Sequence, residues 1–163
     1  MNEKWIWLDM DGTFADLYSV KNWLEDLQAY NTRPYRKAKS MYNDIDLMAI
    51  LACLKGEGYK IGVISWGSKT SDEKYLKAVA ETKKEWLANR GYDLVIDKVI
   101  VTAYGIKKAD MCRKYGRGIL VDDEERNRKE WDLGETINAQ FDILSQLEAL
   151  MKRPRAARAL ADF

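Results

Sequence analysis

Short apolar runs alternate with segments of helical periodicity along most of this chain. The apolar runs predict buried strands at residues 5–8, 59–64, 95–102, 118–123 and 136–138. Apolar residues spaced three and four apart predict helices over 20–30, 47–54, 71–90, 107–115, 124–132 and 141–151. Strands that alternate with helices are joined by right-handed crossovers into a parallel sheet. The pattern therefore predicts an α/β fold built on a doubly wound parallel sheet.

Helix boundaries and buried faces follow from the same pattern. Asp44 or Asp46 is expected to cap the helix over 47–54, which stops at Gly56-Glu57-Gly58. The inner face of the last helix is expected to carry Phe141, Leu144, Leu147 and Leu150. Cys53 and Cys112 fall where helical spacing places small buried residues and show no metal-ligand spacing, so we expect two core thiols.

The length of 163 residues suits one domain, which we place at 1–152. Within it, residues 31–43 are polar, basic and interrupted by Pro34, so this stretch is expected to leave the core either as a small lid or as an ordinary solvated loop. A cap insertion would occupy about 19–43. Residues 153–163 form a basic tail whose role the sequence leaves open.

Composition removes several classes of function. The 27 basic and 26 acidic residues nearly cancel, which gives no general attraction for nucleic acid. No apolar run is long enough to span a membrane and no secretory leader is recognisable, so we expect a soluble, cytoplasmic protein. The chain has no histidine, which excludes Ser-His-Asp and Cys-His catalysis and histidine-ligated zinc. Acid–base chemistry is left to carboxylates, Lys, Tyr or Cys.

Polar residues follow the apolar strands at the point where each strand ends. Asp9 and Asp11 come after the first run, and two acids on one side of an extended strand call for a cation such as Mg²⁺. Gly12 permits a sharp turn there, and the Thr13 hydroxyl can cap it. Taken alone, this motif is equally compatible with an acidic strand-to-turn junction without function, because short motifs match by chance.

The strand ends that follow favour a functional site over a plain turn. Ser65 and the turn Trp66-Gly67-Ser68 follow the second long strand, where a hydroxyl and backbone N–H groups can bind an oxyanion. Lys107 or Lys108 opens the next helix, and Asp122 and Asp123 end the strand after it. Because parallel strands share one carboxyl edge, we expect these groups to converge, although each alone could be a plain turn or a solvated lysine.

Asp-x-Asp-Gly-Thr, then Ser, Lys and Asp-Asp in this order resemble the four motifs of the haloacid dehalogenase superfamily, in particular its Mg²⁺-dependent phosphohydrolases. The resemblance covers residues 4–138 and implies a HAD-like, Rossmannoid fold with a minimal or absent cap. It also implies that Asp9 is the nucleophile that forms an aspartyl-phosphate and that Asp11 is the general acid and base. Ser65 and Lys108, or Lys107 instead, would hold the phosphate.

The resemblance also implies the remaining contacts of the site. Mg²⁺ would be bound by Asp9, Asp122 and the Asp11 carbonyl, with Asp123 beside them. The substrate would meet four residues of the turns after the first two strands: Gly12, Thr13, Trp66 and Gly67. A clamp of Mg²⁺ and lysine is what a phosphoryl group needs when it meets a carboxylate nucleophile.

The substrate is less well defined. Asp-Met-Asp-Gly with Phe-Ala-Asp, and Leu-Val-Asp-Asp-Glu with Asn127, resemble the small-capped 5′(3′)-deoxyribonucleotidases and the capless magnesium-dependent phosphatases. We expect a phosphomonoesterase that acts on a small phosphorylated metabolite or nucleotide, with Tyr18, Trp66 or Tyr35 stacking on a base. A nucleic-acid 3′-phosphatase that uses the basic runs 33–39 and 152–158 is the alternative. A non-enzymatic phospho-receiver ranks last, because its motifs occur in another order. Oligomeric state is left open.

Overall fold

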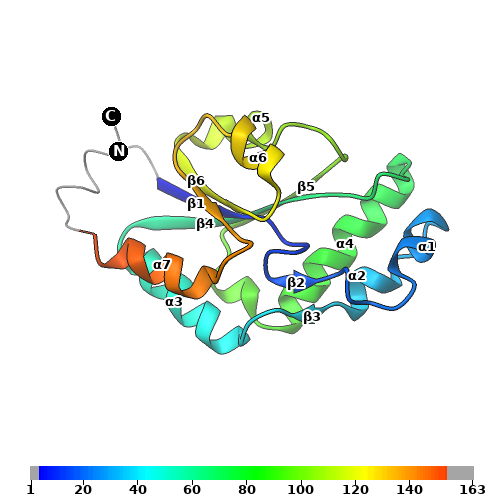
Figure 1. The fold of residues 1–163 in the computed structure, drawn as a ribbon, viewed down its shortest axis with the longest axis horizontal. Helices are drawn as coiled ribbons and strands as arrows, with labels where there is room; N and C mark the ends of the chain where they lie inside the picture. The colour runs from blue at the N-terminus through cyan, green and yellow to red at the C-terminus, as the bar shows by residue number, and fades with distance from the viewer. Residues whose placement is uncertain (1–3, 154–163) are drawn as a thin grey trace.

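The computed structural model describes residues 4–153, which surround a five-stranded parallel sheet (Figure 1). The strands are β1 (Lys4–Leu8), β4 (Tyr59–Trp66), β5 (Lys98–Thr102), β6 (Gly118–Asp122) and β7 (Thr136–Asn138). Their order is β5-β4-β1-β6-β7 and every pair is parallel, so the predicted doubly wound α/β sheet is confirmed. After β1 the chain forms β4 and β5 on one side of β1, and it then crosses to form β6 and β7 on the other side. The carboxyl end of β1 is therefore the switch point of the sheet, where such folds hold ligands.

Helices cover both faces of the sheet because the side chains of β1 alternate. Ile6 and Leu8 join one core with α3 (Asp44–Gly56), α7 (Ile143–Met151) and the C-terminal half of α4 (Glu73–Asn89). Trp5 and Trp7 join a second core on the opposite face, with α5 (Lys108–Cys112) and the residues that follow α6 (Glu125–Glu130). The alternation of a buried strand thus fixes β1 between two layers of helices.

Two helix predictions need correction. Asn43, not Asp44 or Asp46, caps α3: its side chain accepts from the backbone N–H groups of Ile45 and Asp46, because its extended backbone places it just outside the helix. Phe141 is 68% exposed, since α7 begins only after the cap residue Asp142 and Ile143 takes the buried position.

The two cysteines differ in burial. Cys112 is buried as predicted, but Cys53 is exposed. Its position on α3 lies off the stripe of Leu47, Ile50, Leu51 and Leu54 that faces the core. The expectation of a second core thiol is therefore wrong.

The expected excursion at 31–43 has regular structure. It contains α2 (Arg33–Lys37) and β3 (Lys39–Ser40), which pairs antiparallel with β2 (Ala15–Asp16). The helix expected over 20–30 is shorter, α1 (Trp23–Gln28). Leu17, Leu27 and Tyr35 from this part of the chain pack on Tyr75 and Val79 of α4. The small unit thus rests on α4 beside one end of the sheet (Figure 1).

Short 3-10 turns account for the remaining differences. Tyr92–Leu94 form one such turn, so β5 begins at Lys98 rather than at residue 95, and Arg113–Tyr115 form another after α5. Of the basic tail at 153–163, all but Arg153 lies outside the described residues. Within residues 4–153, none of the helices combines the length and apolar character needed to cross a membrane.

Candidate active site

The turn after β1 is folded around one carbonyl group. The Met10 carbonyl accepts backbone N–H groups of Thr13, Phe14 and Ala15 at 3.1, 3.1 and 3.0 Å. Gly12 has φ +79°, and a Cβ there would lie 2.5 Å from Oδ2 of Asp123. Only glycine meets both conditions, so Gly12 lets the two acidic strand ends approach each other.

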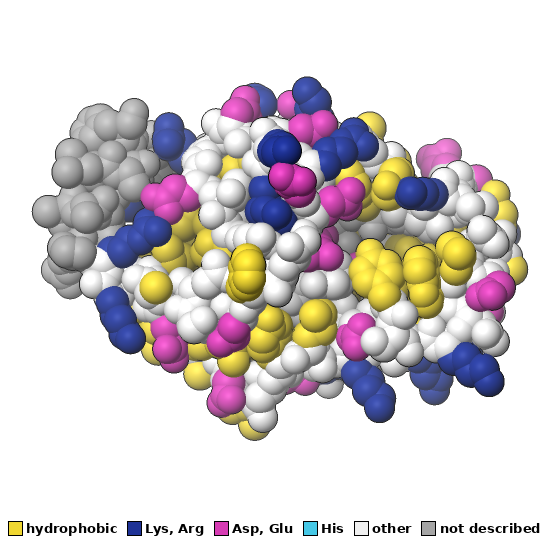
Figure 2. Space-filling view, viewed as in Figure 1, with side chains coloured by type: hydrophobic (Ala, Val, Ile, Leu, Met, Phe, Trp, Pro, Cys, Tyr) yellow, Lys and Arg dark blue, Asp and Glu magenta, His cyan; other side chains and the backbone are white. Residues whose placement is uncertain are grey.

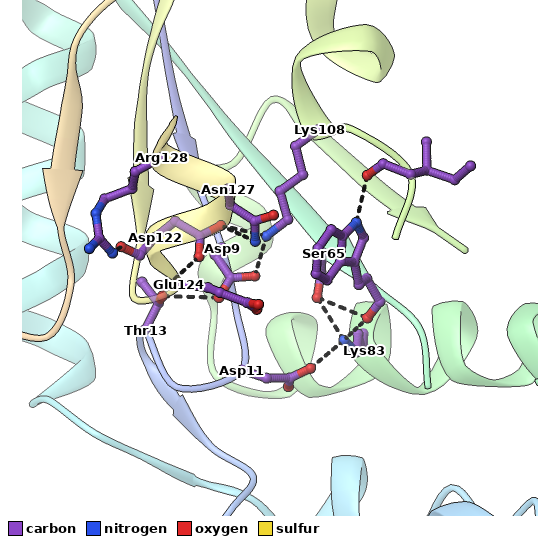
Figure 3. Close-up of polar contacts among 12 residues, drawn as sticks. Asp9, Asp11, Thr13, Ser65, Lys83, Lys108, Asp122, Glu124, Asn127 and Arg128 are labelled. Carbon is purple, nitrogen blue, oxygen red and sulfur yellow. Dashed lines mark hydrogen bonds and ion pairs between the residues drawn. The ribbon is translucent and has the colours of Figure 1, made fainter. Parts of the chain in front are cut away.

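Asp9 lies at the carboxyl end of β1 and is almost fully buried, with 6% exposure. Its Oδ1 accepts from Nζ of Lys108 at 2.7 Å, and its Oδ2 accepts from Oγ1 of Thr13 at 3.1 Å (Figure 3). Lys107 is exposed at the cap position of α5, whereas Lys108 begins the helix and is buried. The structure therefore brings Lys108, not Lys107, to the predicted nucleophile.

Lys108 also joins Asp9 to the end of β6. Its Nζ lies 2.6 Å from Oδ2 of Asp122, and the same oxygen accepts from the Asn127 amide at 3.1 Å. Burial lowers the pKa of Lys108, but the carboxylates of Asp9 and Asp122 raise it by more, so the pKa lies above its ordinary value. The lysine stays charged at neutral pH.

Asp9, Asp122 and Asp123 form an acidic cluster in which carboxylate oxygens lie within 4.8 Å of one another. Burial raises the pKa of Asp122 to about 6 and that of Asp123 to about 7, and repulsion from Asp9 contributes to both. Three converging carboxylates that repel one another suit a hard divalent cation with oxygen ligands. The Asp11 carboxylate lies outside this cluster.

A second buried lysine, which the sequence analysis did not single out, contacts Asp11. Nζ of Lys83, from α4, lies 2.6 Å from Oδ2 of Asp11 and 2.6 Å from Oγ of Ser65 (Figure 3). Burial raises the pKa of Asp11, and the Lys83 ammonium offsets this only in part. The sequence did carry a signal: Lys83 follows Val79 by four residues and precedes Trp86 by three, which puts a charge on the apolar stripe of α4.

Ser65 lies one residue before the carboxyl end of β4 and reaches the same edge of the sheet. The Ser65 hydroxyl is buried, accepts from Lys83 at 2.6 Å and donates only over a long 3.5 Å contact to the Trp66 carbonyl, which a phosphoryl oxygen could replace. The N–H of Gly67 donates to the Thr102 carbonyl at 2.8 Å, so of the backbone N–H groups expected to bind an oxyanion after Ser65, that of Gly67 is already paired. A Cβ at Gly67 would lie 2.5 Å from Leu76, which explains the glycine by packing. Trp66 is anchored through Nε1 to the Ile106 carbonyl at 2.7 Å.

Asp9, Asp11, Lys108, Asp122 and Asp123 line a cavity of about 460 Å³, whereas Ser65 and Lys83 are not part of its lining. One wall consists of Leu17, Tyr18, Trp23, Leu24 and Leu27, and Trp66 and Tyr104 pack together on another. Figure 2 shows hydrophobic side chains in a row beside a hollow with acidic side chains at its far edge.

The aromatic residues expected to stack on a base differ in exposure. Tyr35 is only 3% exposed, and its ring lies over the Lys83 ammonium, 4.7 Å from the centroid. Tyr18, by contrast, is 53% exposed on the cavity wall. Tyr18 therefore offers a base more ring surface than Tyr35, although Tyr35 also borders the cavity.

Comparison with known proteins adds the fold of one solved structure. No protein-family model matches the chain, and no curated protein matches it. A crystal structure of D,D-heptose 1,7-bisphosphate phosphatase from Burkholderia thailandensis matches with a TM-score of 0.53 and 11% identity. The match covers 93% of this chain and 100% of the other. The chain thus has the HAD-like, Rossmannoid fold that the motifs imply, and it shares this fold with a phosphatase.

Proposed function

We propose that this protein is a Mg²⁺-dependent phosphomonoesterase that works through an aspartyl-phosphate on Asp9. The observation that carries the proposal is the placement of Asp9 at the carboxyl end of the central strand. It is held there by Lys108 at 2.7 Å and Thr13 at 3.1 Å, next to the carboxylates of Asp122 and Asp123. A nucleophile fixed beside a charged lysine suits attack on an anionic phosphoryl group.

The side chains divide the reaction between them. An oxygen of Asp9 forms a bond to phosphorus while the bond from phosphorus to the ester oxygen breaks, and the leaving oxygen takes a proton from Asp11. Asp11, now a carboxylate, takes a proton from a water whose oxygen bonds to phosphorus while the bond from phosphorus to Asp9 breaks, so that phosphate leaves and the Asp9 carboxylate is restored. The raised pKa of Asp11 favours the protonated form that the first step needs. Lys108 and the Ser65 hydroxyl hold phosphoryl oxygens.

The acidic cluster fits the metal that this chemistry requires. Asp9, Asp122 and Asp123 offer hard oxygen ligands within 4.8 Å of one another. Burial first, and then repulsion from Asp9, raise the pKa values of Asp122 and Asp123, and a bound cation would offset both effects. Bound Mg²⁺ would neutralise charge on the phosphoryl group. Asn127 orients Asp122 through the 3.1 Å hydrogen bond.

The cavity supports a small substrate with a flat apolar part, such as a nucleoside monophosphate. Its volume of about 460 Å³ lies in the range of small-molecule sites. Tyr18 and Tyr104 are 53% and 38% exposed and offer ring surface to a base. Residues 17–43 supply the apolar wall of the cavity, and we propose that they act as a small cap over this substrate.

The test is turnover of phosphate esters by the wild type and by Asp9→Asn. The wild type should hydrolyse an aryl phosphate with Mg²⁺, lose activity in excess EDTA and regain it when Mg²⁺ is restored. Asp9→Asn should lose at least about 1,000-fold in kcat, because the amide has the shape of the acid but is no nucleophile. Asp110→Asn on the exposed side of α5 is the matched control and should stay active. Undiminished turnover in EDTA would refute the metal-dependent mechanism, and an active Asp9→Asn would refute the nucleophile.

A further inference from the structure

Lys83 occupies a place that none of the four motifs accounts for. It comes from the middle of α4, and its side chain is 0% exposed, yet it ends between Asp11 and Ser65. A buried ammonium is costly unless its hydrogen bonds are made and its charge is paired. A lysine placed here therefore has a structural or a chemical task that offsets this cost.

All three donors of the Lys83 ammonium are used inside the protein. Nζ lies 2.6 Å from Oδ2 of Asp11, 2.6 Å from Oγ of Ser65 and 2.8 Å from the Trp66 carbonyl. The ring of Tyr35 covers it at 4.7 Å. Since an ammonium has three N–H groups, no donor remains for a phosphoryl oxygen. Lys108 differs, because Asp9 and Asp122 occupy only two of its donors.

The side chain of Asp11 depends on this lysine for its orientation. Among the described residues, Lys83 is its one hydrogen-bonding partner. The turn around Met10 fixes the Asp11 backbone but leaves rotation about χ1, and the charge of Asp9 repels the carboxylate. The contact with Lys83 holds Oδ2 in place and leaves Oδ1 as the oxygen that faces no protein donor.

We propose that Lys83 is a positioning residue, which fixes Asp11 for proton transfer to the leaving oxygen. The inference rests on the proposed function and adds a residue to it. In the first step the Asp11 proton moves to the ester oxygen as its bond to phosphorus breaks. Lys83 touches neither atom and acts through Asp11. Removal of Lys83 should therefore slow the reaction only as far as the leaving group needs that proton.

The test compares two esters of similar shape in the wild type and in Lys83→Met. Phenyl phosphate releases a basic phenolate that needs a proton, whereas 2,4-dinitrophenyl phosphate releases one that does not. Lys83→Met should lower kcat/KM for phenyl phosphate about 100-fold and for the dinitrophenyl ester less than about 5-fold, because a misplaced general acid affects only the first. Lys84→Met, an exposed neighbour on the same helix, is the control and should change neither value.

A double variant separates positioning from a role in folding or in phosphate binding. In the Asp11→Asn background, Lys83→Met should cost less than about 3-fold, since the lysine no longer has a carboxylate to hold. The double variant has no buried carboxylate without a partner at this place. Its comparison with Asp11→Asn therefore tests the positioning role even if Lys83→Met alone does not fold. Equal losses on both esters, or a large further loss in the Asp11→Asn background, would overturn the inference while leaving the proposed function intact. A wild type that hydrolyses neither ester would overturn both.

Discussion

Two buried lysines divide the charges at the carboxyl edge of the sheet into two groups. Lys108 joins Asp9 to Asp122, and Lys83 joins Asp11 to Ser65. The acids Asp9 and Asp11 are only two residues apart, yet each has its own cation. Different surroundings of this kind are what the proposed reaction requires, in which Asp9 is the nucleophile and Asp11 the proton donor.

The acidic cluster predicts how stability depends on pH. Because burial and mutual repulsion raise the pKa of Asp122 to about 6 and of Asp123 to about 7, the folded state binds more protons than the unfolded state between about pH 4 and 7. The free energy of unfolding without metal should therefore fall as pH rises through this window. We expect the Tm at pH 7.5 to lie a few degrees below that at pH 5, as about 1 kcal/mol would give in a domain of this size.

Added Mg²⁺ should remove this difference, because it binds the deprotonated carboxylates and stabilises the folded state most at pH 7.5. The pKa of Asp97 is lowered, so this residue changes the pH dependence of stability only below about pH 4, outside the window of pH 4 to 7. Thermal unfolding of the wild type and of Asp123→Asn, with and without Mg²⁺, provides the measurement. A Tm that drops on acidification from pH 7.5 to 5 in the absence of metal would contradict the cluster described here.

At the scale of elements, the packing of the β1 side chains constrains the neighbouring strand β4. Trp5 and Trp7 stack with their ring centroids 4.7 Å apart, and the neighbouring strand β4 makes room with Gly62. A Cβ at Gly62 would lie 2.3 Å from two carbons of the Trp7 ring, which is 0% exposed. Here a glycine is required by its missing side chain and not by its backbone angles.

Gly62→Ala should therefore destabilise the protein by roughly 1–3 kcal/mol, the usual cost of forcing a methyl group into a filled core. Gly56→Ala is the control, because a Cβ at that end of α3 meets nothing within 4 Å. Urea denaturation of both variants checks this. A Gly62→Ala protein as stable as the wild type would show that the Trp7 ring moves aside without cost.

The small unit of α1, α2, β2 and β3 predicts a second effect, on substrate affinity. If Tyr18 stacks on a base, Tyr18→Ala should raise KM for a nucleoside monophosphate about 10-fold and leave KM for glycerol phosphate unchanged, because stacking on a base is worth about 1–3 kcal/mol. Tyr30→Ala serves as the control: Tyr30 is 49% exposed and packs on Tyr75 away from the cavity lining. Equal changes for both substrates would argue against a planar substrate at this wall.

At the scale of the whole molecule, the near balance of 27 basic and 26 acidic residues favours a small substrate over a polyanion. The basic stretch at 33–39 agrees with this in part. Nε of Arg33 donates to Asp26 at 2.6 Å, and Arg36 donates to the Thr32 hydroxyl at 2.9 Å. Two of its cations are thus already engaged within the protein.

Charge reversal at Arg36→Glu/Lys37→Glu tests the oligonucleotide alternative. We expect weak oligonucleotide binding with a shallow salt dependence that the variant leaves unchanged, and equal mononucleotide turnover. Lys74→Glu/Lys77→Glu, on the exposed side of α4, carries the same change of charge as a control. A steep wild-type slope that flattens by about 0.7–0.9 per lost contact only in the first variant would instead favour nucleic-acid end processing.

Some features were predictable because they depend on neighbours in the chain. Apolar runs predicted the five strands, and the polar residues at the strand ends predicted that Asp9, Asp122 and a lysine at 107 or 108 would meet. The ends of helices were harder to predict from the sequence. Whether Asn43 or Asp44 caps α3 depends on backbone angles that neighbouring polar residues can adopt equally well.

Other features arise only from contacts between distant segments. The sequence alone determined the α/β class, the parallel order of acidic strand ends and the absence of histidine chemistry, since these follow from local periodicity and composition. The tertiary structure alone decided that Lys108 and not Lys107 reaches Asp9, that Lys83 holds Asp11 across 72 positions, and that Tyr35 covers this lysine. Which of two adjacent side chains faces the interior depends on how the helix is rotated when it packs on the sheet. That rotation is set by contacts throughout the folded protein, which the local sequence does not contain.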